Sequence, residues 1–227
     1  MVTIQLQSQA AEDARRAVAL HELGHAAVWF FAGHDFGAVE MATRTEGGEV
    51  KVKGNVVGPG EAGQVRVNVA VPNEGTERGE DIAYRLWGCL KMAVAIAGGM
   101  AATVLEGKHG RTSSDADRET YDEGLRTCVE HGGEALFAVA AANRIAEAAI
   151  GNNLDAIRRL QPLLMERGTL TLADVAGHLR KAPMPFCFPP LTRPEAEAAM
   201  MPRPLTKEQT EIVAQALAAQ QAAQTQG

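Results

Sequence analysis

The segment from Val18 to Ala32 constrains the fold more than any other part of the sequence. Its residues are apolar nearly all round a helix, and Gly24 is the only glycine or proline inside it. A helix of this kind is expected to be buried. The segment nevertheless contains two histidines and a glutamate, and burial of such groups is costly unless they find partners. The fold must therefore bring polar groups to this helix.

The remaining sequence predicts further helices and a small sheet. Aromatic residues make up only 4% of the chain and alanine is abundant, which favours closely packed helices. Valine alternates with polar residues in two stretches, as in half-buried strands. We therefore expect a mainly α (α+β) fold with a small antiparallel three-stranded sheet next to the helix that carries the histidines. The expected strands are 38–44, 49–57 and 64–71, and the expected helices are 12–32, 77–106, 115–131, 134–150, 153–167, 171–181 and 206–219.

The C-terminal part of the chain differs in composition from the rest. Seven of the ten prolines fall between Pro183 and Pro204, which predicts an irregular or extended segment before the last helix. We therefore expect one domain over residues 1–181, followed by a proline-rich segment and a C-terminal helix over 182–227.

Charge and hydropathy restrict the partners. The net charge is -6 without a dominant cluster of Lys or Arg, so we expect no nucleic-acid binding. Leu86 to Leu105 is long and apolar enough for a membrane span. However, Lys91, several glycines and many alanines lie within it, so we expect an internal helix and no membrane span.

Cysteine usage and the N-terminal sequence indicate the compartment. Cys89, Cys128 and Cys187 are scattered and form no C-x-x-C pair, which argues against a cysteine-based zinc site. Free thiols of this kind are typical of a reducing compartment. The N-terminus lacks the features of a signal peptide. We therefore expect a cytoplasmic protein.

The sequence His21-Glu22-Leu23-Gly24-His25 is an H-E-x-x-H motif. Positions i and i+4 share one face of a helix, so both imidazoles can reach one metal ion, while the glutamate between them can hold and deprotonate a water molecule. A catalytic zinc usually has a third protein ligand. It is not close by, because the positions where a short extended motif would place it are Val28 and Phe31. The candidates elsewhere are His34, His109, Asp115, Asp117, Glu119, Asp122 and His131.

Three stretches together resemble the peptidase domain of the FtsH-type zinc proteases. The first is the H-E-x-x-H helix continuing into Ala26, Ala27 and Val28. The second is Ala97-Gly98-Gly99-Met100-Ala101-Ala102, similar to the family's Gly-Gly-x-Ala-Ala helix. The third is Thr112-Ser113-Ser114-Asp115 with Thr120, similar to the family's segment in which an aspartate at a helix start binds zinc. The likeness covers roughly residues 10–180.

The resemblance implies a role for each matching residue. His21, His25 and Asp115 would be the zinc ligands, and Glu22 the general base. Asp117 is the closest rival to Asp115, which the family's spacing to Thr120 favours. Gly98 and Gly99 are expected to allow close helix packing rather than to touch substrate.

The expected activity is that of a zinc-dependent endopeptidase acting on unfolded or flexible polypeptides. The sequence contains no G-x-x-x-x-G-K-[ST] phosphate loop, so we expect ATP-independent cleavage by the isolated chain. A valine-rich strand, 49–57 or 64–71, could hold the substrate at the sheet edge. Two alternatives stay open: a protease-derived metal-binding regulator, and a peptidase subunit that works with a separate ATPase. A homo-oligomer also stays open.

Overall fold

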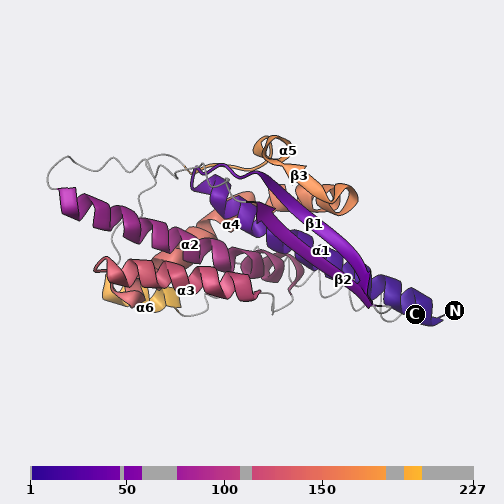
Figure 1. The fold of residues 1–227 in the computed structure, drawn as a ribbon, viewed down its shortest axis with the longest axis horizontal. Coiled ribbons are helices and arrows are strands. Elements are labelled where there is room, and N and C mark those ends of the chain that lie inside the picture. Colours follow the sequence, from indigo (N-terminus) through magenta and orange to yellow (C-terminus); the bar gives the residue numbers. More distant parts are fainter. Residues whose placement is uncertain (1, 47–48, 58–75, 108–113, 183–191, 201–227) are drawn as a thin grey trace.

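The computed structural model describes residues 2–46, 49–57, 76–107, 114–182 and 192–200. In these ranges the chain is mostly helical, with one small antiparallel sheet, as predicted (Figure 1). The helices are α1 (Val2–Phe31), α2 (Thr76–Glu106), α3 (Asp115–Glu130), α4 (Ala135–Arg167), α5 (Leu172–Ala176) and α6 (Arg193–Met200). The strands are β1 (Ala38–Glu46), β2 (Glu49–Val57) and β3 (Thr169–Thr171).

The sheet has the strand order β2-β1-β3, with both pairings antiparallel. The predicted hairpin of the first two strands is confirmed, and it lies alongside α1 (Figure 1). The third strand is β3, which the sequence did not predict, while the expected strand 64–71 lies outside the described residues. A run of three residues is too short to show alternation. Its position depends on Gly168, whose φ of 74° turns the chain back after α4, and on pairing with β1.

The region from residue 134 to 167 is one continuous helix, α4, rather than the two helices that were predicted. The break was expected around Gly151. In the structure the next two side chains reinforce the helix, because the Asn152 and Asn153 amides donate to the carbonyls of Ala148 and Ala149 at 2.7 and 2.8 Å. Packing of α4 against α1 and α2 stabilises the helix on both sides of the glycine.

The C-terminal elements also differ from expectation. A capping box of Thr171 and Asp174 begins helix α5, which ends at Ala176 rather than near residue 181. A further helix, α6, lies within the segment expected to be irregular. It packs on α4 and buries Ala196 completely. The expected helix 206–219 lies outside the described residues.

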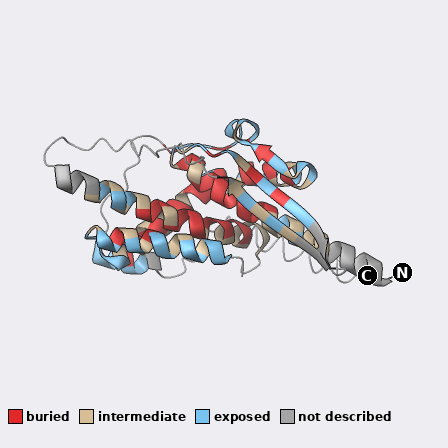
Figure 2. Cartoon of the chain, viewed as in Figure 1, coloured by how far each residue is buried: buried red, intermediate tan, exposed pale blue. Residues whose placement is uncertain are grey.

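The core lies where α1, α2 and α4 meet (Figure 2). At the crossing of α1 and α2, a Cβ added to Gly24 would lie 2.6 Å from the carbonyl oxygen of Ala97 and 2.9 Å from the Cβ of Ala101. Real contacts do not occur at such distances, so the crossing requires glycine on α1 and favours small residues on α2. This close approach explains the alanine-rich composition of both helices.

Helix α2 contains the apolar segment considered as a membrane span. Asp81–Glu106 is long and apolar enough to cross a membrane, but 61% of its most apolar window is buried inside the protein. It packs against α1, α3 and α4, and the charge of Lys91 is paired with Glu123 of α3 at 2.6 Å. These contacts are those of a core helix.

The helix crossing can be tested with two glycine substitutions. Helix propensity alone favours alanine over glycine by ~1 kcal/mol, but at Gly24 the new methyl group would meet a backbone carbonyl. We expect Gly24→Ala to lower the free energy of unfolding by ~1–3 kcal/mol, measured by urea denaturation. Gly151→Ala is the matched control, since its Cβ would meet nothing within 4 Å, and it should raise stability by up to ~1 kcal/mol. If both substitutions stabilised the protein, the close approach of α1 and α2 at Gly24 would be contradicted.

Candidate metal centre

Helix α1 carries the motif residues into the interior of the protein. His21, Glu22 and His25 are each only 7% exposed. Because the histidines are one helical turn apart, their rings lie next to each other, edge to face, with the two Nε2 atoms 2.9 Å apart. The polar groups that this apolar helix had to accommodate therefore gather at one point.

Asp117 supplies the negative charge that these buried groups need. Its carboxylate oxygens lie 3.2 Å from the Nε2 of His21 and 3.3 Å from the Nε2 of His25. Local structure holds the carboxylate in place, since Asp117 is also the third residue of the α3 capping box. The amide of Ser114 donates to it at 2.8 Å, and its own amide donates to the Ser114 hydroxyl at 3.1 Å. One side chain thus caps α3 and joins it to α1.

Asp115, the aspartate that the sequence favoured, is not brought to the histidines. It is the first residue of α3, its side chain is fully exposed, and its ion-pair partner is Arg118 at 3.7 Å. Two positions along a helix correspond to a rotation of about 200°, so Asp115 and Asp117 face opposite sides. Of the two aspartates, the structure thus brings Asp117, and not Asp115, next to the histidines.

The other candidate ligands lie elsewhere or outside the described residues. His34 packs edge-on against Trp29 and Trp87. His131 lies at the far end of α3, where it forms a hydrogen bond with Asp81 at 2.8 Å and stacks on a tyrosine ring. Glu119 and Asp122 are exposed on α3, and His109 lies outside the described residues.

The three polar side chains fit a metal ion. The Nδ1 of His25 donates to the carbonyl of Val94 at 2.6 Å, and since a carbonyl only accepts, Nδ1 carries a proton; the neutral ring would therefore present its Nε2 lone pair to a metal ion. That lone pair faces the Nε2 of His21 and the Asp117 carboxylate. One ligand atom from each of the three residues lies within 4.8 Å of the other two, so all three side chains can reach a single ion.

Glu22 lies between the two histidines in sequence and is covered by the sheet. A Cβ added to Gly54 of β2 would come within 2.5 Å of a Glu22 carboxylate oxygen, so a side chain at this position would displace the carboxylate. Burial is the main cause of a raised Glu22 pKa; the charge of His21 opposes this shift, that of Asp117 adds to it, and the resulting pKa is about 7. The carboxyl group is thus suited to accepting and releasing a proton near neutral pH.

Asp117 behaves in the opposite way. Burial by itself would raise the pKa of Asp117, but the hydrogen bonds from His21 and His25, together with the amide of Ser114, hold the pKa well below its usual range. Two carboxyl groups in one site therefore differ in basicity. Asp117 is suited to holding a cation, and Glu22 to moving a proton.

Helix α2 forms the wall behind His21. A Cβ added to Gly98 would lie 2.4 Å from the Nδ1 of this ring, so the glycine allows the helix to approach the imidazole. The predicted packing role of Gly98 is confirmed. The Nδ1 atom has no hydrogen-bond partner among the described residues, which leaves the His21 ring held mainly by packing and by its Nε2.

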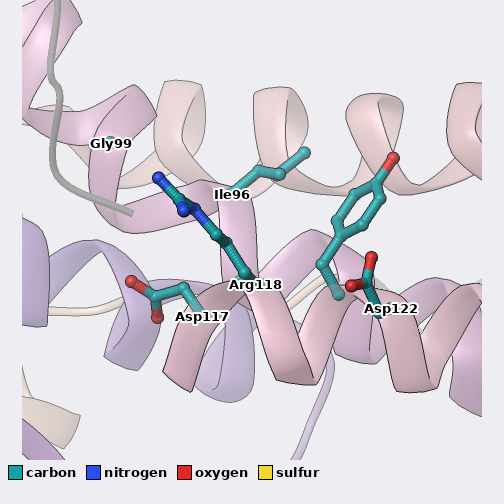
Figure 3. A pocket seen from close by; sticks show the side chains of 7 residues that line it. Ile96, Gly99, Asp117, Arg118 and Asp122 are labelled. Carbon is teal, nitrogen blue, oxygen red and sulfur yellow. The ribbon is translucent and has the colours of Figure 1, made fainter. Parts of the chain in front are cut away.

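A pocket opens beside Asp117 between α2 and α3. Figure 3 shows Asp117, Arg118 and Asp122 along one helix, facing Ile96 and Gly99 of the next. The pocket has a volume of about 410 Å³ and is completed by Ala95 and Tyr121. The candidate metal centre is therefore reachable from solvent although its histidines are buried. No sequence pattern identified this pocket, because its lining comes from two helices.

A search against models of protein families found no match to this chain, and a search of curated proteins for similar sequences found none either. Function is therefore inferred from the residues and their geometry.

The choice between the two aspartates is directly testable. We expect Asp117→Asn to weaken zinc binding at least ~100-fold, because it removes the charge that faces both histidines while keeping the shape and the helix cap. Asp115→Asn, two residues away and fully exposed, is the control and should change the affinity by less than about twofold. Competition with a chromophoric chelator measures both. A larger loss for Asp115→Asn would restore the original assignment.

Proposed function

We propose that the chain is a zinc-dependent endopeptidase that cleaves unfolded or flexible polypeptides. The observation that carries the proposal is the convergence of His21, His25 and Asp117 on one point, with Glu22 beside it on the same helix. The order of motifs, which resembles that of the FtsH-type peptidases, supports the same activity. In this proposal Asp117 takes the place that the resemblance gave to Asp115.

The residues divide the work between binding and proton transfer. His21, His25 and Asp117 would hold the ion, and the bond from His25 to Val94 keeps the correct nitrogen free. When bound, zinc would polarise the scissile carbonyl and lower the pKa of a water molecule. Glu22 would take the proton from the attacking water at its carboxylate and return it to the leaving amine. Its raised pKa and the cover provided by β2 suit both steps.

The sheet supports an extended substrate. β2 is bonded to β1 on one side only among the described strands, and its inner face packs on Glu22 through Gly54. A polypeptide added to the open edge of β2 would run past the general base, held by main-chain hydrogen bonds that demand little of the side chains. Such binding requires an unfolded segment. With no phosphate loop in the sequence, the isolated chain would act without ATP.

Substitution of Glu22 separates catalysis from metal binding. Glu22→Gln should keep zinc, since the three ligands are unchanged, but lose at least ~100-fold in the cleavage rate, because an amide cannot accept the proton. The assay is digestion of an unfolded casein-type substrate, with and without a chelator and with and without ATP. Chelation should abolish wild-type cleavage, and ATP should change nothing.

Two results of this assay would point to other functions. Zinc binding without cleavage by the wild type would favour the metal-binding regulator. Cleavage that appears only when a separate ATPase is supplied would favour the peptidase subunit. Equal cleavage by wild type and Glu22→Gln would contradict the assignment of Glu22.

The substrate edge is tested by proline at two consecutive positions of β2. Backbone N–H groups alternate between the two edges of a strand, so Val52→Pro and Lys53→Pro remove donors on opposite edges. One of the two variants lacks an N–H group on the edge of β2 that faces away from β1. For this variant we expect a several-fold higher KM for an unfolded polypeptide and little change in kcat. The other variant should loosen the β1–β2 hairpin and lower thermal stability. If neither variant alters KM, β2 has no part in substrate binding.

A further inference from the structure

Two cysteine thiols face each other across the contact between α2 and α3. The Sγ atoms of Cys89 and Cys128 are 3.7 Å apart, and the residues are 7% and 1% exposed. Neither belongs to the candidate metal centre. Cys128 follows Asp117 by eleven residues, which is about 16 Å along the helix. The pair is therefore a separate feature of the same two-helix contact.

The backbone around the thiols is fixed by two glycines. A Cβ on Gly88 would lie 2.5 Å from the carbonyl oxygen of Gly124 and 2.6 Å from the Sγ of Cys128, and a Cβ on Gly124 would lie 2.6 Å from the carbonyl oxygen of Gly88. The helices thus touch backbone to backbone next to the sulfurs. Since a disulfide has an S–S length of ~2.05 Å, the sulfurs need to approach by less than about 2 Å, which side-chain rotation can supply.

Hydrogen bonds make the two sulfurs unequal. The Cys128 thiol donates to the carbonyl of Arg85 at 3.2 Å, which leaves the Cys89 thiol to donate to the Cys128 sulfur. This hydrogen bond lowers the pKa of Cys128. The same bond and burial both raise the pKa of Cys89. Cys128 is therefore the sulfur that ionises first, with Cys89 beside it as the resolving thiol.

We propose that Cys89 and Cys128 are an oxidative modification site that closes to an intramolecular disulfide in response to a peroxide. The thiolate of Cys128 attacks one peroxide oxygen, breaking the O–O bond and giving a sulfenic acid and water. The sulfur of Cys89 then attacks the sulfenic sulfur, forming the S–S bond and releasing a second water. Overall two thiols are oxidised by two electrons, and hydrogen peroxide is reduced to two molecules of water.

The disulfide would fasten α3 to α2. The residues are 39 positions apart in the chain, so the bond closes a long loop and restricts the unfolded state. It would also secure the helix that presents Asp117 to α1. In a reducing compartment the bond would form only during oxidative stress and would be reversed by cellular thiols.

The test uses the full chain with Cys187→Ala, which removes the third cysteine. After treatment with hydrogen peroxide, tryptic digestion should yield the peptide Leu86–Lys91 linked to Thr127–Arg144, lighter by two hydrogens than the sum of the two. The melting temperature should rise by roughly 5–10 °C and return to its starting value with dithiothreitol.

The matched controls are Cys89→Ala and Cys128→Ala in the same background, which should show no rise in melting temperature after peroxide. Two unreacted thiols after prolonged peroxide treatment, or sulfinic acid at either cysteine without the linked peptide, would overturn the proposal. The peptide readout does not depend on zinc or on peptidase activity, so failure of the proposed function would leave it unchanged.

Discussion

Backbone-to-side-chain contact between α1 and α2 is the constraint on which the rest of the structure depends. Gly24 lets the two helices cross at a carbonyl, and Gly98 lets α2 press against the ring of His21. Such contact excludes water from the motif helix. Its three ionisable groups are then left in an apolar layer, where an unpartnered charge is strongly unfavourable.

The N-terminus of α3 relieves this cost. Asp117 at the third position of the capping box satisfies the amide of Ser114 and faces both histidines, and a carboxylate is also favoured at a helix N-terminus. Helix α3 packs along α2, and the two backbones approach closely at Gly88 and Gly124. Stability and the candidate site are therefore linked, because the same helix packing that completes the core delivers the third polar side chain.

The sheet closes the other side of the site. Gly54 allows β2 to lie directly on Glu22, and this burial gives the carboxyl group a pKa quite unlike that of Asp117. The pocket beside Asp117 keeps the centre reachable from solvent. Helices on one side and the face of a strand on the other thus enclose a small polar site within an alanine-rich protein.

The sequence by itself determined the elements whose patterns are local. These include the motif helix with His21, Glu22 and His25 on it and the first two strands, β1 and β2. Only the tertiary structure decided that α4 runs on past Gly151, because packing on both sides outweighs the helix preference of one residue. The third strand, β3, likewise exists only through its pairing with β1. Asp117 rather than Asp115 lies next to the histidines because its side of α3 meets α1, and no local sequence pattern encodes this contact between elements far apart in the chain.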